Sequence, residues 1–139
     1  MDQNSIFTID TSALLAILFN ESDAERFELA LEADPIRLLS TTSLLETAIV
    51  VEARLGEAGG RELDLLLDKA QISIVAFTAE HAKIARQAYR TYGKGRHLAG
   101  LNYGDCFAYA LAKTTGEPLL FKGNDFSQTD ITTCVFPQQ

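Results

Sequence analysis

Short apolar, β-branched runs alternate with longer segments of helical periodicity along the chain, and this alternation limits the fold more than any other feature of the sequence. It is typical of a wound α/β fold, in which helices cover a mostly parallel sheet. The apolar runs predict strands over residues 5–10, 36–40, 72–77, 119–121 and 133–136. The periodic segments predict helices over residues 12–18, 22–33, 41–55, 60–70, 79–92 and 104–115.

Local signals mark the ends of several of these helices. One of Thr41, Thr42 and Ser43 is expected to cap the helix over residues 41–55. Asn102 and Asp105 have the spacing of a capping box at the start of the last helix. Glycines complete the pattern: Gly56, Gly59 and Gly60 separate two helices, and Gly116, followed by Pro118, ends the last one.

Size and composition predict a single domain over residues 1–139. A chain of 139 residues with 47% hydrophobic residues can bury one sizeable core but hardly two. Cys106 and Cys134 are the only cysteines and form no C-x-x-C motif, which suits a reducing compartment. Because there is no apolar run long enough to span a bilayer and no leader-like N-terminus, we expect a soluble, cytoplasmic protein with no membrane partner.

The charge of the chain is unevenly distributed. A formal net charge of −7 and a pI near 4.7 argue against an ordinary, electrostatically driven nucleic-acid-binding protein. One stretch nevertheless carries basic residues with no acid between them: Arg86, Arg90, Lys94, Arg96 and His97. Three glycines in and after this stretch favour a mobile loop that could follow a phosphate backbone, although a solvated surface loop with incidental charges is the plainer interpretation.

Four acidic residues stand where apolar or small residues are usual. Asp10 ends the first strand and Asp125 follows the fourth, whereas Glu46 and Asp105 lie near the starts of two apolar helical segments. In an open parallel sheet, strand ends and helix starts converge on one crevice, so the four side chains can meet there. Clustered carboxylates need a cation, and hard oxygen ligands select Mg²⁺ or Mn²⁺. The sequence therefore predicts a metal site.

Each acid also has a purely structural interpretation. Asp10 can cap the first helix, Asp105 can complement a helix dipole, and Asp125 fits an ordinary turn. Glu46 is harder to explain in this way, because at helical spacing it shares an apolar face with Ile49, Val50 and Ala53, where a lone glutamate needs a partner. The joint placement of the four acids at one edge of the sheet favours a shared site.

Other reaction classes fit the sequence less well. Residues 93–100 miss the dinucleotide-binding fingerprint, because Leu98 stands where its third glycine belongs, and no phosphate-binding P-loop motif is present. The G-x-S-x-G motif of serine hydrolases is absent too. A phosphatase of the haloacid dehalogenase type would carry a second aspartate where this chain has Ser12. A metal-dependent phosphatase of the α/β class nevertheless stays open as an alternative.

Motifs along nearly the whole chain resemble those of PIN-domain ribonucleases, and in particular the VapC toxins of bacterial type II toxin–antitoxin systems. The motifs are Ile9–Leu15, Leu44–Glu46, Asn102–Ala112 and Leu120–Phe126. By position, the resemblance assigns Asp10, Glu46 and Asp105 to the family's metal ligands and Asp125 to its fourth, more variable acid. Ser12, with Thr11 beside it, matches a supporting polar position. Asn124 stands where some relatives have a further acid, which leaves occupancy by a second metal open.

The resemblance implies a three-layer α/β/α PIN-like domain with a central, mostly parallel sheet. It also implies a Mg²⁺- or Mn²⁺-dependent endoribonuclease that leaves a 5′-phosphate, acts on RNA as a toxin, forms a homodimer and is neutralised by a small VapB-like antitoxin. A divalent cation held by the acids can activate water and stabilise charge on the scissile phosphate. A catalytically silent PIN-like module that binds RNA or protein is the other alternative.

Overall fold

The computed structural model describes residues 5–33 and 35–134. In chain order the elements are β1 (Ile6–Ile9), α1 (Thr11–Leu18), α2 (Ala24–Ala33), β2 (Ile36–Ser40), α3 (Thr41–Lys69), β3 (Ser73–Val75), α4 (Ala79–Tyr92), α5 (Tyr103–Thr115), β4 (Leu119–Leu120) and the 3₁₀ turn η1 (Phe126–Gln128). The strands form one sheet in the order β3-β2-β1-β4, and every neighbouring pair is parallel. The strand order reverses between β1 and β4, and a ligand crevice is expected beyond the carboxyl ends of these two strands.

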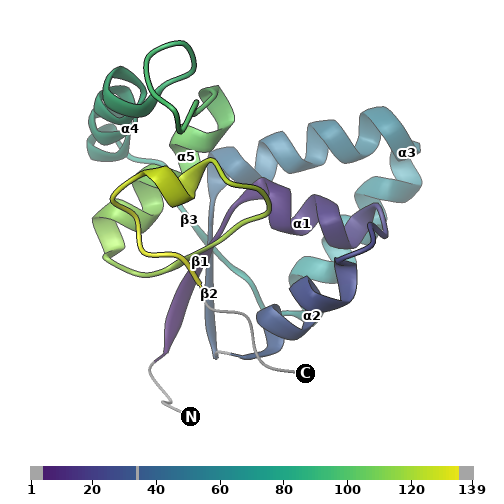
Figure 1. Cartoon of the computed structure of the whole chain (residues 1–139). Helices are drawn as coiled ribbons and strands as arrows, with labels where there is room; N and C mark the ends of the chain where they lie inside the picture. Colours follow the sequence, from purple (N-terminus) through teal and green to yellow (C-terminus); the bar gives the residue numbers. More distant parts are fainter. Residues whose placement is uncertain (1–4, 34, 135–139) are drawn as a thin grey trace.

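Helices cover both faces of the sheet, so the domain has three layers (Figure 1). Side chains of β1 alternate between the faces: Phe7 and Ile9 enter a core shared with α1, α2 and part of α3. Leu119 of β4 enters the other core, which α4 and α5 complete, whereas its neighbour Leu120 points into the first. This alternation explains why the strands read as short runs buried on both sides. The three-layer α/β/α prediction is confirmed.

The long helix α3 contains both of the helices predicted over residues 41–55 and 60–70, joined across a kink. It contains a sharp kink at Gly56, the one residue of the helix with non-helical backbone angles (φ 68°, ψ −161°). A positive φ is a conformation that glycine adopts at little cost. Gly59 is helical, and glycine is needed there because of space: the residue is buried, and a Cβ would lie 2.7 Å from side-chain atoms of both Val51 and Leu55. The predicted break is therefore confirmed but rests on Gly56.

The predicted end of α5 is confirmed, whereas the predicted cap at the start of α3 is wrong. Gly116 ends α5 in the left-handed conformation (φ 73°), and its N–H donates to the carbonyl of Ala112. At the start of α3, Ser40 occupies the cap position instead of one of the next three residues, and its side chain makes no capping bond. The reason is that β2 runs directly into α3. The hydroxyl of Thr41 accepts a hydrogen bond from the N–H of Phe77 instead (3.1 Å).

Half of the predicted last strand, residues 135–136, lies outside the described residues. Thr133 forms a single parallel bridge to Leu119, and residues from 135 onward are not described. Among the helices of the described ranges, none combines the length and the apolar character needed to cross a membrane.

Candidate metal centre

Asp10 lies at the carboxyl end of β1, where the strand passes into α1. Its N–H donates to the carbonyl of Leu120 on β4 (2.9 Å), which fixes it at the point where the strand order reverses. Its Oδ2 accepts hydrogen bonds from the N–H (3.0 Å) and the hydroxyl (2.5 Å) of Ser12, so the predicted capping role is confirmed. The residue is only 4% exposed, and this burial raises the pKa of its carboxyl to about 6.

Ser12 connects this carboxylate to the segment that follows β4. Its hydroxyl donates to Asp10 and accepts a hydrogen bond from the N–H of Lys122 (2.9 Å). The side chain of Lys122 turns to two other acids, Glu21 and Asp23, at 2.9 and 3.0 Å. The backbone of residue 122 therefore supports the site, a role that no motif in the sequence indicated.

Glu46 reaches the site from α3 and rests against the first turn of α5. A Cβ added to Gly104 would lie 1.9 Å from its Oε2 and 2.6 Å from its Cδ, so the half-buried carboxylate occupies the space that any other side chain at position 104 would need. Gly104 was not among the site residues predicted from the sequence. Its only signal was a glycine directly before Asp105 in the first turn of a helix.

The apolar face of α3 that Glu46 shares with Ile49 and Val50 is exposed. Ile49 is 61% exposed and Val50 37% exposed. The buried residues of this stretch lie on another face of the helix: Ser43, Thr47 and Val51. The hydroxyl of Thr11 donates to the carbonyl of Ser43 (3.1 Å) and accepts from the hydroxyl of Thr47 (3.0 Å). Thr11 thus joins α1 to α3 without contacting the acids through any of these bonds.

Asp105 is held by a reciprocal capping box at the start of α5, as predicted. Its N–H donates to the side chain of Asn102 (2.8 Å), and its Oδ2 accepts from the N–H of Asn102 (2.9 Å). Burial raises the pKa of its carboxyl to about 7, against the lowering effect of the Asn102 N–H. The negative charges of Asp10 and Asp125 raise the pKa further, as does a hydrogen bond with Asp125.

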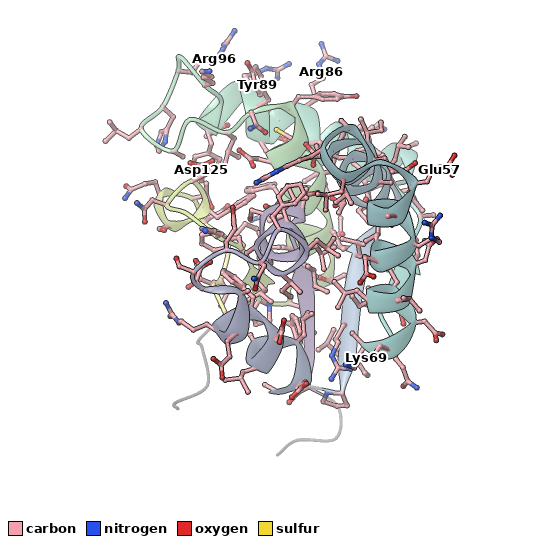
Figure 2. The ribbon with its side chains drawn as sticks, turned by 90° about the vertical axis from the view of Figure 1, so that its right-hand side faces the viewer. Glu57, Lys69, Arg86, Tyr89, Arg96 and Asp125 are labelled. Atoms are coloured by element: carbon pink, nitrogen blue, oxygen red, sulfur yellow. The ribbon has the colours of Figure 1, made fainter. Side chains whose placement is uncertain are left out.

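Asp125 lies just before η1 and is exposed at the rim of the site (Figure 2). Its backbone is helical (φ −59°, ψ −45°), and the next residue, Phe126, is buried against Phe121 in an edge-to-face contact of 5.0 Å. This anchor sets the position of the turn. Asn124 is exposed, and its carbonyl accepts a hydrogen bond from the N–H of Ser127 (3.2 Å).

The structure thus brings the four acids to one edge of the sheet, where they act on one another electrostatically. Burial is the main cause of the raised pKa of Asp10, and the negative charges of Glu46 and Asp125 raise it further. Within the described residues, no three acidic, cysteine or histidine side chains stand as a ready-made metal-binding group. The donor atoms are nevertheless all carboxylate oxygens, and their mutual repulsion is what a divalent cation offsets. This donor set fits Mg²⁺ or Mn²⁺.

The predicted basic stretch lies on α4 and on the loop over residues 93–101. Arg86 and Arg90 are exposed on the helix, and Lys94, Arg96 and His97 are exposed on the loop. Figure 2 shows Arg86 and Arg96 projecting from the end of the molecule opposite Lys69. The loop is closed by hydrogen bonds between Lys94 N–H and the Leu101 carbonyl (2.8 Å) and between Leu101 N–H and the Tyr92 carbonyl (2.9 Å).

His97 has a structural contact in addition to its predicted role. Its Nδ1 accepts a hydrogen bond from the N–H of Ala99 (2.9 Å), and its ring packs edge-to-face on Tyr92 at 5.0 Å. Both contacts lie within the loop and the end of α4. The loop over residues 93–101 is therefore organised around this ring, which leaves Lys94 and Arg96 as its freely projecting cations.

Comparisons with known proteins agree on one family. Residues 7–131 match the PIN domain model. The chain is 67% identical over 129 residues to ribonuclease VapC30 of Mycobacterium tuberculosis, covering 93% of this chain and 98% of that protein. It is 64% identical over 123 residues to ribonuclease VapC of Mycolicibacterium smegmatis, covering 88% and 95%.

Solved structures of similar fold include a VapC and a VapBC structure. Mycobacterium tuberculosis VapC20, described as a sarcin–ricin loop cleaving toxin, matches with a TM-score of 0.76 and 19% identity, covering 96% of this chain and all of that one. VapBC-1 from nontypeable Haemophilus influenzae matches with a TM-score of 0.66 and 18% identity, covering 93% and 96%. At such identities the likeness concerns the fold.

Proposed function

The chain belongs to the PIN-domain family and, within it, to the VapC ribonucleases, the toxins of toxin–antitoxin systems, and from this we propose that Asp10, Glu46 and Asp105 hold a catalytic Mg²⁺ or Mn²⁺ ion. Asp125 completes the set from the rim of the site. One observation carries the proposal: the buried carboxyl of Asp10, at the end of β1, and the half-buried carboxyl of Asp105, at the start of α5, both have raised pKa values, and the charges of neighbouring acids contribute to both shifts. Such an arrangement is unfavourable for the fold and typical of a functional site.

The residues of the site have distinct tasks in this proposal. When bound, the divalent cation activates water for attack and offsets the charge that develops on the scissile phosphate. Asp10 and Asp105 must be ionised to hold the cation, and Ser12 keeps one oxygen of Asp10 oriented through its hydroxyl. Glu46 supplies a third carboxylate across the first turn of α5. Asp125, with Asn124 beside it, is the residue on which a second cation would depend. Cleavage then leaves a 5′-phosphate, as in the family.

RNA is the proposed substrate, and the basic stretch is its proposed path. An acidic protein can approach a polyanion where its own cations offset the field. Arg86 and Arg90 on α4 and Lys94 and Arg96 on the adjoining loop are exposed, and His97 lies among them. These side chains would contact backbone phosphates, so the contacts themselves carry no sequence preference.

A VapB-like antitoxin and a second copy of the chain are the proposed protein partners, and the cytoplasm is the proposed location. We propose that the antitoxin lays a tail beside the acids and presents a basic side chain to them, in competition with metal or RNA. The exposed apolar residues of α3 nearby, Leu45 (62% exposed) and Ile49 (61% exposed), are candidate contacts for such a tail. A peptide of that tail that saturates the protein yet leaves metal binding and cleavage unchanged would contradict this mechanism.

Replacing Asp105 with asparagine tests the proposed function. Asp105→Asn retains the shape and most of the capping ability of the residue but loses the charge that binds the cation. We expect a folded protein in which Mg²⁺-dependent RNA cleavage is lost and Mn²⁺ affinity, measured by titration calorimetry, falls. Asp68→Asn is the matched control, since Asp68 is exposed at the end of α3 beside Lys69, far from the acids (Figure 2).

Three results would contradict the proposal. The first is wild-type cleavage by folded Asp105→Asn protein, which would remove the carboxylate from the chemistry. The second is hydrolysis of small phosphomonoesters without RNA cleavage, which would favour the phosphatase alternative. The third is RNA binding that persists unchanged in EDTA with no cleavage under any condition, which would indicate a silent binding module.

A further inference from the structure

An apolar pocket of about 570 Å³ lies between α4 and the start of α5. This volume is within the range of small-ligand sites. Its lining includes four aromatic residues, one arginine and one cysteine: Phe77, Tyr89, Tyr103, Phe107, Arg86 and Cys106. The metal centre uses none of these side chains, although Cys106 directly follows Asp105.

The aromatic rings of this pocket are arranged as walls. The Phe107 ring contacts Tyr103 at 4.8 Å and 73° and Phe77 at 5.4 Å and 79°, both edge to face. Rings packed in this way do not cover one another as stacked rings do, so a flat ligand can still stack on them. Tyr103 is 79% exposed and Tyr89 41% exposed. Exposed aromatic rings of this kind are the platforms on which single-stranded nucleic acids stack their bases.

Charge favours an anionic occupant. Arg86 lines the pocket from α4, three residues before Tyr89, and none of the described residues that line it is acidic. The chain as a whole carries a net charge of −7, so this combination of arginine and aromatic rings is locally unlike the rest of the surface. A protein helix seeking an apolar groove would not need the arginine, whereas an RNA base with its phosphate uses both features.

The pocket adjoins the metal centre across the tip of α5. Tyr103 and Phe107 are one turn apart on one face of the helix, and Asp105 lies on nearly the opposite face. Gly104, with the Glu46 carboxylate against it, lies between them. A helix with its side chains is about 10 Å across, so an occupant of the pocket belongs to a nucleotide near the scissile phosphate and not to the phosphate itself.

We propose that this pocket binds an unstacked nucleobase of the RNA, next to the cleaved bond, with Tyr103 and Tyr89 as stacking platforms and Arg86 against the backbone. The proposal rests on the ribonuclease function proposed above and assigns it a base-binding subsite. Aromatic rings stack on any base, so the main role of the pocket is to hold the RNA strand in place. The shape of the pocket has only a secondary influence on which base is bound.

The test measures binding of a short, unstructured RNA that carries a single 2-aminopurine, alongside the same RNA with an abasic site at that position. The protein is the full chain in the Asp105→Asn background, compared with added Tyr103→Leu or Tyr103→Phe. We expect Tyr103→Leu to weaken binding of the intact RNA about 5- to 150-fold, and Tyr103→Phe to rescue it because the ring is retained. The abasic RNA should bind all three proteins equally weakly, and 2-aminopurine emission should be quenched less by Tyr103→Leu than by the proteins that keep a ring at position 103.

Equal losses for intact and abasic RNA would overturn the proposal, because the effect would not act through a base. So would unchanged RNA affinity in Tyr103→Leu together with a changed sedimentation coefficient, which would make this face a contact between copies of the chain. Cleavage by the protein with native Asp105 separates the two proposals. Metal-dependent cleavage with an inert pocket removes only the subsite, whereas a protein that neither binds nor cuts RNA removes both.

Discussion

Replacing Gly104 with alanine should strongly impair RNA cleavage without unfolding the protein. Gly104 is in the first turn of α5 and is absent from the residues with positive φ, so its backbone suits alanine. Alanine is favoured over glycine in a helix by up to about 1 kcal/mol, so the free energy of unfolding should hold or rise. The three atoms nearest to the new Cβ all belong to the carboxylate end of Glu46. The strain therefore falls on a flexible side chain, which rotates away.

The size of the effect follows from the contact distances. The new Cβ would lie 1.9 Å from Oε2, and Cβ contacts under 3.0 Å essentially do not occur, so the carboxylate must move by at least 1.1 Å. Misplacing a catalytic group by about 1 Å can reduce the rate by about a hundredfold. We expect kcat/KM for RNA cleavage to fall by about that factor, with weaker Mn²⁺ binding by calorimetry and an unchanged or higher urea midpoint.

Two further variants make the test decisive. Gly60→Ala is the matched control, because its Cβ would also meet a glutamate, Glu52, but at 3.1 Å and on an exposed part of α3. It should not alter cleavage. Combining Gly104→Ala with Glu46→Gln should cost no more than Glu46→Gln alone, since both act through one carboxylate. Wild-type cleavage and metal affinity in folded Gly104→Ala, or additive losses in the double variant, would refute this reasoning.

Two other outcomes are expected. The first concerns the pH dependence of stability in EDTA. Because the pKa of the Asp10 carboxyl is raised from 3.8 to about 6 in the folded protein, the folded state binds the proton of this carboxyl more tightly than the unfolded chain does. The resulting stabilisation is complete below about pH 4 and is lost as the pH rises through about 6. The loss amounts to at most about 3 kcal/mol; urea unfolding of Asp10→Asn should lack this pH dependence, and an identical slope in both proteins would contradict it. Replacing Lys94 and Arg96 with alanine in the Asp105→Asn background should weaken RNA binding similarly across sequences and flatten its log–log salt dependence by about 0.7 per lost phosphate contact. Metal affinity should not change, and coincident salt plots for the two proteins would remove the loop from the RNA path.

Sequence reasoning placed three of the four acids for the right physical reasons. Asp10 and Asp125 could be predicted to meet because the carboxyl ends of parallel strands share one edge of a sheet. Asp105 could be placed because its spacing from Asn102 is that of a capping box, which is a local signal. Glu46 was singled out for an apolar face that proves to be exposed. Its real constraint, contact with Gly104, joins residues of α3 and α5 that only the folded chain brings together.

The pocket beside α5 could not be predicted for the same reason. Phe77, Tyr89 and Phe107 each read as a core or surface aromatic residue when taken singly, and only the packing of α4 against α5 turns their rings into walls. The short first turn of α5 therefore separates two environments, an acidic one around Asp105 and an aromatic one around Tyr103. Under the two proposals made above, a cation would hold the phosphate on one side and stacking would hold a base on the other. An RNA strand bound in this way would cross the tip of α5, so the geometry of the two sites would position the bond to be cut without any recognition of base identity.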